Sequence, residues 1–269
     1  MTDARRPAVL AIAGSDSGGG AGIQADLRAI AAHGVHGTCA ITALTAQNTR
    51  GVTAVHVPPV DMLHTQIDAC FEDFDIRAVK IGMLATRGVI DAVAQALERH
   101  RPAHVVLDPV MVATSGATLL EPDAIDALRT RLLPRATLLT PNGPEAALLT
   151  GARVETSDDL DAALRALAAL GARGVLLKGG HLLDPRGVVD TLEVDGTCTE
   201  VVSPRRALEA HGTGCTLSSA IAARLARDEA LVEAVRGGIA FVQAALAAGY
   251  VAGRAPLRLL DTSAIDTSP

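Results

Sequence analysis

The chain has 269 residues, of which 49% are hydrophobic and 1% aromatic, and its formal net charge is −6. This composition supplies a large core of Ala, Leu, Val and Ile, while the scarcity of aromatic side chains disfavours single-stranded nucleic-acid binding, which uses them as stacking platforms. The acidic balance and the lack of a basic run give no indication of a nucleic-acid partner or of an anionic membrane surface.

The four cysteines are far apart in the sequence and include no CxxC pair. They do not indicate a disulfide framework or a zinc-finger-like site, so we expect reduced thiols in a cytoplasmic protein. The segment RRPAVLAIAG resembles a secretory or twin-arginine signal, but its apolar run is short and continues directly into SDSGGGAG. We interpret it as a first strand, and we expect no membrane-spanning segment.

Strand-like and helix-like patterns alternate along the chain. The apolar run AVLAIAG is typical of a buried parallel strand, and after a glycine-rich loop Ile23, Leu27 and Ile30 fall on one helical face. Helical patterns around residues 63–74, 90–97, 125–132 and 160–170 are each followed by a strand-like segment, in turn IRAVKIG, HVVLDPV, ATLLT and GVLLKGG. This alternation predicts an α/β fold with a mostly parallel central sheet and helices on both faces.

Two segments depart from the alternation. GTCAITALTAQNTRGVTAVHV reads as two strands without a helix between them, which predicts a small β excursion at about residues 38–57. VVDTLEVDGTCTEVV predicts a hairpin around Asp195-Gly196, a dipeptide suited to a type I′ turn. The chain is mostly helical after Gly214, and we see no linker or repeat, so we expect residues 1–269 to form a single domain.

Polar and glycine-rich clusters follow several of the predicted strands. In open α/β sheets, ligands bind beyond the carboxyl ends of the strands, so these clusters are expected to share one crevice. The first, GSDSGGGAG, lacks the Lys-Ser or Lys-Thr of a P-loop and the pattern of a dinucleotide fingerprint. A plain turn would hardly need three consecutive glycines, and we predict that this backbone contacts a ligand.

The segment HGTGC directly precedes a helical run. Its exposed amides and the helix N-terminus predict an anion site, with Gly212 and Gly214 leaving the backbone uncovered. Cys215 would lie in the first helical turn, where we expect the helix dipole to lower the pKa of its thiol. A buried, inert cysteine is the alternative, whereas a metal site with His211 lacks further ligands at suitable spacing.

Three polar positions after later strands have two interpretations each. In TPNGPEA, Asn142 and Glu145 either form a helix cap or belong to a site in which Glu145 holds Mg²⁺ through water. Asp108, at the end of HVVLD, has the same two interpretations. Lys178 is either a surface lysine or a charge that faces phosphate.

Taken together, GSDSGGGAGIQADL, TALTAQNT, KIGML, LDPVM, TPNGPEA, LLKGGH and HGTGC resemble the hydroxymethylpyrimidine/phosphomethylpyrimidine kinases of thiamine biosynthesis, which belong to the ribokinase-like superfamily. The likeness runs from about residue 8 to about residue 250. It implies a ribokinase-like fold and ATP-dependent phosphorylation of 4-amino-5-hydroxymethyl-2-methylpyrimidine, first to the monophosphate and then to the diphosphate. It also implies Mg²⁺ as a cofactor and a homodimer.

The resemblance implies roles for individual residues. Gly212, Thr213 and Gly214 match an anion hole for the transferring phosphoryl group, and Cys215 stands where most ribokinase-like sugar kinases carry an aspartate base. The implied substrate-binding residues are Gly14, Asp26, Gln47, Met83 and Val110, of which Asp26 and Gln47 match residues that grip the pyrimidine's amino group and ring nitrogens. The implied Mg-ATP surroundings are Asp108, Asn142, Glu145 and Lys178, with Asp108 and, through water, Glu145 at the metal. Thr114 takes a position where a lysine is common.

We hypothesise that a cysteine at position 215 serves both phosphorylation steps. A thiolate would take the proton of the alcohol in the first step, and a neutral thiol would not repel the anionic monophosphate in the second.

Three rival functions remain open. A pyridoxal kinase of the same superfamily is the nearest, but the side-chain amide of Gln47 offers both a donor and an acceptor, which suits an aminopyrimidine edge. A thiol hydrolase with Cys215 as nucleophile would need a histidine base, and His211 lies on the wrong side of a glycine turn. A non-catalytic regulator would bind the pyrimidine without turning over ATP.

Overall fold

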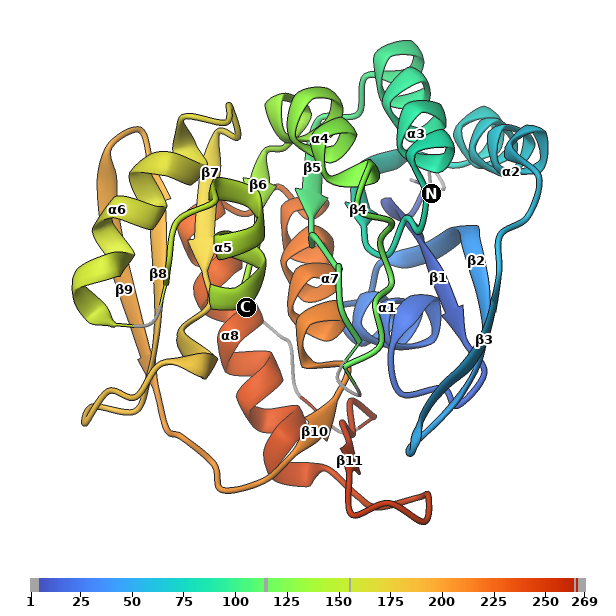
Figure 1. Cartoon of the computed structure of the whole chain (residues 1–269). Coiled ribbons are helices and arrows are strands. Elements are labelled where there is room, and N and C mark those ends of the chain that lie inside the picture. Colours follow the sequence, from blue (N-terminus) through green and yellow to red (C-terminus); the bar gives the residue numbers. More distant parts are fainter. Residues whose placement is uncertain (1–4, 114–115, 155, 264, 266–269) are drawn as a thin grey trace.

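A nine-stranded sheet forms the centre of the molecule (Figure 1). The computed structural model describes residues 5–113, 116–154, 156–263 and 265. The strand order is β3-β2-β1-β4-β5-β6-β7-β8-β9. The strands are β1 (Ala8–Asp16), β2 (His36–Asn48), β3 (Gly51–His56), β4 (Ile76–Ile81), β5 (His104–Leu107), β6 (Leu138–Leu139), β7 (Gly174–Leu177), β8 (Val188–Val194) and β9 (Thr197–Ser203).

Six neighbouring strands pair in parallel, in the order β2-β1-β4-β5-β6-β7. β3 adds antiparallel at the β2 edge, and β8 and β9 add antiparallel at the β7 edge. The predicted mostly parallel sheet is therefore confirmed. A separate pair of short parallel strands, β10 (Ala210–His211) and β11 (Arg258–Leu259), lies beyond the carboxyl ends of the central strands.

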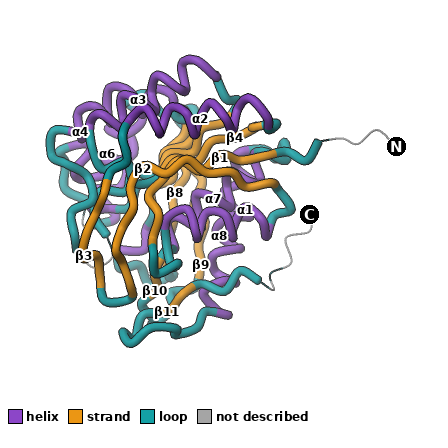
Figure 2. The backbone as a smooth tube through the Cα atoms, turned by 90° about the vertical axis from the view of Figure 1, so that its right-hand side faces the viewer, coloured by secondary structure: helices purple, strands orange, loops and turns teal. Residues whose placement is uncertain are grey.

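Helices cover both faces of the sheet, as the alternation predicted (Figure 2). They are α1 (Gly22–Ala32), α2 (Val60–Asp73), α3 (Arg87–His100), α4 (Ala124–Ala127), α5 (Gly143–Thr150), α6 (Ser157–Ala168), α7 (Thr213–Leu225) and α8 (Leu231–Ala248). The helix predicted around residues 125–132 is α4, which continues as a wider π-type turn over Leu128–Leu132.

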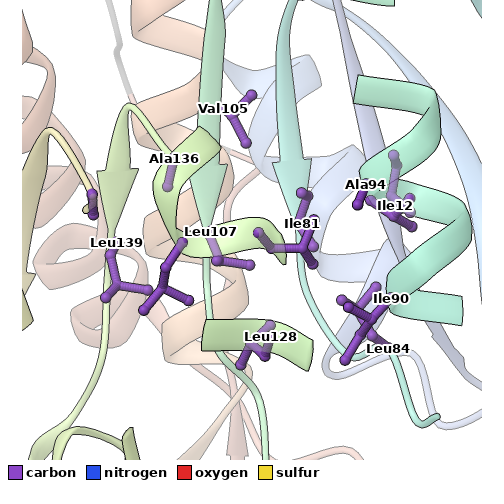
Figure 3. Close-up of a cluster of buried hydrophobic side chains, with 14 of the residues drawn as sticks. Ile12, Ile81, Leu84, Ile90, Ala94, Val105, Leu107, Leu128, Ala136 and Leu139 are labelled. Atoms are coloured by element: carbon purple, nitrogen blue, oxygen red, sulfur yellow. The ribbon is translucent and has the colours of Figure 1, made fainter. Parts of the chain in front are cut away.

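The pleat of β1 explains why a separate hydrophobic cluster lies on each face of the sheet. Successive side chains of a strand point to opposite faces, so Leu10 and Ile12 pack with α2 to α6, while Val9 and Ala11 pack with α1, α7 and α8. Figure 3 shows part of the first cluster, in which aliphatic side chains of neighbouring strands and helices lie together. Because both faces are buried, the strands are continuous apolar runs rather than alternating ones.

The two predicted departures from the alternation are also present. β2 and β3 span residues 36–56, close to the expected excursion at 38–57, and they pair antiparallel from Leu44 to His56. The hairpin of β8 and β9 turns at Asp195 and Gly196, whose φ angles of 50° and 79° are the left-handed values that a type I′ turn requires.

We expected no segment of membrane-spanning length and hydropathy, but α8 meets both criteria. By length and hydropathy alone, α8 is long and apolar enough to cross a membrane. It nevertheless buries Val235, Ile239 and Val242 in the cluster that it shares with α7, and it carries Glu233 and Arg236. These features are those of an amphipathic core helix.

Candidate active site

A cavity of about 540 Å³ lies at the carboxyl ends of the parallel strands. Its lining includes Gly14 from β1, Gln47 from β2, Met83 after β4, Asp108 after β5 and Lys178 after β7. Residues from most of the predicted motifs therefore meet in one crevice, as expected for an open α/β sheet. The remaining predicted residues in its lining are Val110, Asn142, Glu145, Gly212, Thr213, Gly214 and Cys215.

The N-terminus of α7 opens into this cavity. Gly212 is the N-cap residue with a φ of 82°, and a Cβ there would collide with the carbonyl oxygen of Gly20, so only glycine fits. A Cβ on Gly214 would lie 3.3 Å from Lys178 Nζ and 3.4 Å from Asp108 Oδ2. Free backbone amides at a helix N-terminus, next to a lysine, form a site suited to phosphate.

Lys178 lies between two carboxylates. Its Nζ is 3.1 Å from Asp108 Oδ1 and 3.8 Å from Glu145 Oε2. Burial favours the neutral amine, but the charges of Asp108 and Glu145 outweigh it and raise the pKa of Lys178. The lysine is therefore a fixed positive charge at the wall of the cavity rather than the surface lysine of the alternative interpretation.

Asn142 and Glu145 form a reciprocal capping box at the start of α5. Asn142 Oδ1 accepts from the Glu145 N–H at 2.9 Å, and Glu145 Oε2 accepts from the Asn142 N–H at 2.8 Å. The helix-cap interpretation is thus confirmed, and both residues also line the cavity. Burial raises the pKa of Glu145 to about 7, although Lys178 favours its charged form.

The carboxylates of the cavity do not form a metal centre by themselves. Among the described residues, no group of three or more His, Cys, Asp and Glu side chains could hold a metal ion. Mg²⁺ commonly uses one or two protein carboxylates, several waters and the substrate's phosphates. Asp108 and Glu145 beside the phosphate site fit that pattern, because they supply two oxygen donors where phosphates would supply the others.

Cys215 lies in the first turn of α7, as predicted, but the expected direction of its pKa shift is wrong. Burial raises the pKa of the thiol to about 11. The positive charge of Lys80 and the backbone N–H of Gly22 oppose this rise, whereas Asp26 and Asp108 add to it. Desolvation therefore exceeds the effect of the helix N-terminus, and the thiol is neutral at pH 7 in the ligand-free protein.

Asp26 occupies a different place from the one that the resemblance implied. It is not among the described residues that line the cavity, and its side chain is fully excluded from solvent. Asp26 Oδ1 accepts hydrogen bonds from Lys80 Nζ and from Ser219 Oγ, both at 2.8 Å. α1 turns this residue toward Lys80 of β4 and Ser219 of α7, so its carboxylate supports the wall of the cavity from behind rather than lining it. Thr114 lies outside the described residues.

A second network was not predicted from the sequence. Asp16, at the end of β1, accepts from the backbone N–H groups of Gly18, Gly20 and Ala21 at 2.7 to 2.9 Å. Its Oδ2 also lies 3.2 Å from Nε2 of the buried His211. An aspartate two residues before a run of glycines is a local signal for such a turn, because its carboxylate accepts from nearby backbone amides.

The comparisons with known proteins agree with this geometry. Residues 16–258 match the family model described as phosphomethylpyrimidine kinase. A hydroxymethylpyrimidine/phosphomethylpyrimidine kinase of Rhizobium meliloti is 52% identical over 244 residues, which cover 89% of this chain and 90% of the relative. A counterpart from Haemophilus influenzae is 46% identical over 242 residues, covering 88% and 90%.

Two groups of solved structures are similar to this fold. The ADP complex of Bacillus subtilis pyridoxal kinase has a TM-score of 0.89 at 34% identity, covering 96% of this chain and 98% of that one. Phosphomethylpyrimidine kinase from Clostridium difficile has a TM-score of 0.80 at 42% identity, covering 89% and 99%. The fold is therefore that of the ribokinase-like kinases, as the sequence motifs implied, and the chain belongs to the phosphomethylpyrimidine kinase family.

Proposed function

We propose that this chain transfers a phosphoryl group from ATP to the hydroxymethyl group of 4-amino-5-hydroxymethyl-2-methylpyrimidine, and then phosphorylates the monophosphate to the diphosphate. Family membership and the similarity to named kinases of this activity support the proposal. The observation that carries it is that Gln47, with its paired donor and acceptor, lines the same cavity as the amides of α7 and Lys178. One end of the cavity suits a polar ring edge, and the other suits phosphate.

The nucleotide side of the cavity works by positioning and charge. Phosphoryl transfer requires little covalent help from the protein, so fixed positive groups aimed at the phosphates account for most of the catalysis. The backbone amides at Thr213, Gly214 and Cys215 and the ammonium group of Lys178 supply these groups. When bound, Mg²⁺ would neutralise phosphate charge, and Asp108 and Glu145 are the residues that would hold it, directly or through water.

The part of the cavity that would hold the phosphoryl acceptor combines apolar walls with one polar side chain. Met83 and Val110 line the cavity with apolar surface, while Gln47 offers hydrogen bonds. A Cβ on Gly14 would lie 3.0 Å from Met83 Sδ, so glycine lets the Met83 side chain pack closely against the end of β1. A small aromatic ring with a polar edge fits these surroundings.

Cys215 completes the acceptor side. A thiol with a pKa of about 11 carries almost no negative charge at pH 7, so it does not repel an anionic monophosphate. In the first step Cys215 reacts as its thiolate, which the positive charge of Lys80 favours after the thiol has given its proton to solvent. The thiolate takes the proton of the alcohol and becomes a neutral thiol, while the alcohol oxygen bonds to phosphorus and ADP leaves. The structure thus supports the neutral thiol of the second step directly, whereas the thiolate of the first step needs the bound substrates.

The proposal includes a homodimer in the cytoplasm that uses ATP with Mg²⁺. Staphylococcus aureus pyridoxal kinase, with a TM-score of 0.88 to this chain, has been solved with ADP and with AMP-PCP, which supports an adenine nucleotide as donor. Light scattering on the purified protein tests the dimer, and titration of activity with MgCl₂ and with EDTA tests the metal.

Pyridoxal phosphorylation is the second candidate. Pyridoxal kinases are among the structures most similar to this fold, and one of them was solved with pyridoxal bound. A coupled ADP-release assay with the pyrimidine alcohol and with pyridoxal, run side by side, separates the two. We expect the pyrimidine to give the higher kcat/KM, and a clear preference for pyridoxal would reverse the assignment.

A further inference from the structure

The side chain of Gln47 is held at both ends of its amide. Its Oε1 lies 3.1 Å from Thr45 Oγ1, and its Nε2 lies 2.9 Å from His211 Nε2. Thr45 Oγ1 is also 3.0 Å from the carbonyl oxygen of Ser15. The backbone of Gln47 is fixed as well, because its N–H donates to Ser17 Oγ and its carbonyl accepts from the same hydroxyl. The residue proposed to read the substrate is therefore held by hydrogen bonds from both its side chain and its backbone.

The Asp16 carboxylate determines which ring nitrogen of His211 carries the proton. Three backbone N–H groups point at the Asp16 carboxylate, which favours its ionised form. Despite the opposing effect of burial, these bonds and His211 lower the pKa of Asp16. An ionised carboxylate only accepts hydrogen bonds, so His211 Nε2 must carry a proton to bond Asp16 Oδ2 at 3.2 Å.

A protonated His211 Nε2 conflicts with an amide nitrogen at 2.9 Å. Both groups would then be donors, and no hydrogen bond would form between them. A second conflict lies at the other end, where Thr45 has one hydroxyl proton but two acceptors, the Gln47 oxygen and the Ser15 carbonyl.

Turning the amide by 180° removes the donor–donor contact at His211 and leaves the Thr45 proton with a single acceptor. The two ends of an amide have nearly the same shape, so the surrounding hydrogen bonds determine which end is which. In the turned state, Gln47 Oε1 accepts from His211 Nε2–H, and the amide NH₂ donates to Thr45 Oγ1. The Thr45 proton is then free to bond the Ser15 carbonyl, while the single Nε2–H of His211 is shared between Asp16 Oδ2 and Gln47 Oε1 as a three-centre hydrogen bond.

We propose that His211 and Thr45 fix the polarity of the Gln47 amide, with its oxygen toward His211 and its NH₂ toward Thr45, and thereby determine which ring edge the cavity accepts. This inference rests on the proposed function of Gln47 as the reader of the substrate. Each end of the amide still has one hydrogen-bonding site for a ligand, a lone pair on oxygen and an N–H on nitrogen. Together they match a ring with an amino donor next to a ring-nitrogen acceptor, in one orientation only.

Two ligands whose ring edges have opposite hydrogen-bonding polarity test whether His211 and Thr45 fix the Gln47 amide (the amide lock). In the 4-amino pyrimidine alcohol the amino group donates and N3 accepts, whereas in its 4-oxo analogue the oxygen accepts and N3–H donates. We expect the wild-type protein to prefer the amino compound by about ten- to a hundredfold in kcat/KM, because the wrong edge leaves buried polar groups unpaired. Thr45→Val and His211→Phe should lower this preference by about tenfold, because the amide is then free to turn.

Matched controls distinguish the amide lock from a purely structural role of Thr45 and His211. Thr45→Ser keeps the hydroxyl and should keep the preference, and Gln47→Leu removes the amide and should abolish it. Thermal unfolding of each variant identifies any loss that comes from misfolding. If Thr45→Val and His211→Phe weaken both ligands equally and leave their ratio unchanged, or if the wild-type protein accepts the two edges equally well, the lock does not exist.

The tautomer of His211 tests the same inference without a substrate. The ¹⁵N chemical shifts of the two imidazole nitrogens show which of them is protonated, and we expect the proton on Nε2 at neutral pH. A neutral ring protonated only at Nδ1 would overturn the proposal. If the tautomer is as expected but neither pyrimidine is phosphorylated, the proposed function is wrong, and with it the claim that Gln47 selects the substrate. If the variants change the ratio of kcat/KM between the amino and oxo compounds, both the proposed function and the fixed polarity of the amide are supported.

Discussion

The ammonium group of Lys80 lies 2.8 Å from the carboxylate of Asp26, and neither side chain is exposed to solvent. The pair joins β4 to α1, and Ser219 of α7 donates to the same carboxylate oxygen. The second oxygen, Oδ2, makes no hydrogen bond within the described part of the chain. A buried charge pair with incomplete hydrogen bonding stabilises a fold weakly, but breaking it is costly because the remaining charge stays buried.

Lys80→Met should therefore be strongly destabilising. We expect a loss of about 3–5 kcal/mol in the free energy of unfolding, measured by urea denaturation, because Asp26 would be left buried without its partner. The double variant Lys80→Met/Asp26→Leu should recover most of that loss. Arg236→Ala, which breaks an exposed pair with Glu233, is the control and should cost at most about 1 kcal/mol. A Lys80→Met variant as stable as this control would contradict a buried, coupled pair.

Glu145 should give the protein a distinctive dependence of stability on pH. Burial raises its pKa from the ordinary value of 4.5 to about 7 in the folded state, so between these values the folded chain holds a proton that the unfolded chain has lost. Stability from this group is fully present below about pH 4.5 and decreases as pH rises to about 7.

Glu145→Gln tests that dependence, because glutamine keeps the capping box but does not titrate. The variant should gain stability relative to the wild-type protein as pH rises from 5 to 8, measured by urea denaturation at each pH. The expected gain has its physical origin in the buried charge that the wild-type protein must carry at pH 8. A difference that stays constant over this range would show that Glu145 titrates normally.

Lys178→Ala should impair the nucleotide side alone. We expect kcat to fall by about 100- to 1000-fold, the size of effect seen when a fixed group that stabilises transition-state charge is removed. Calorimetry without ATP should give nearly unchanged binding of the pyrimidine alcohol. Glu145→Ala should behave in the same direction. Loss of pyrimidine binding in either folded variant would place the residue on the acceptor side instead.

Substitutions of Cys215 should separate the two phosphorylation steps. Cys215→Asp puts a permanent charge beside an anionic monophosphate, a repulsion of about 4 kcal/mol at 4 Å with an effective dielectric constant near 20. It should retain part of the first step and lose the second disproportionately, whereas Cys215→Ala should lose more of the first. Chromatography of monophosphate and diphosphate measures both. Equal support of both steps by aspartate and cysteine would reject the role of the neutral thiol.

Local patterns account for what the sequence predicted well. The alternation of apolar runs, the Asp195-Gly196 turn and the position of Cys215 at the start of α7 all depend on neighbouring residues and hydrogen-bond geometry. The convergence of the motifs follows from the direction of parallel strands, whose carboxyl ends meet at one edge of the sheet. These features need no knowledge of which distant side chains touch.

Features that depend on tertiary packing were not predictable in the same way. Asp26 and Lys80 are 54 positions apart, and their pairing results from how α1 rotates against β4. The shift of the Cys215 pKa has its sign set by burial, which a sequence motif does not measure. One signal was nevertheless available, because Lys80 and Lys178 are the only lysines of the chain, and Lys80 lies between Val79 and Ile81 while Lys178 directly follows the apolar run of β7.

Product analysis of the purified wild-type protein shows whether the chain phosphorylates the pyrimidine alcohol twice. The protein is incubated with ATP, MgCl₂ and 4-amino-5-hydroxymethyl-2-methylpyrimidine, and the pyrimidine products are separated by anion-exchange chromatography over time. We expect the monophosphate to accumulate first and then to be converted to the diphosphate, with one ADP released for each phosphoryl group. Release of ADP without either pyrimidine phosphate, or conversion of pyridoxal alone, would contradict it.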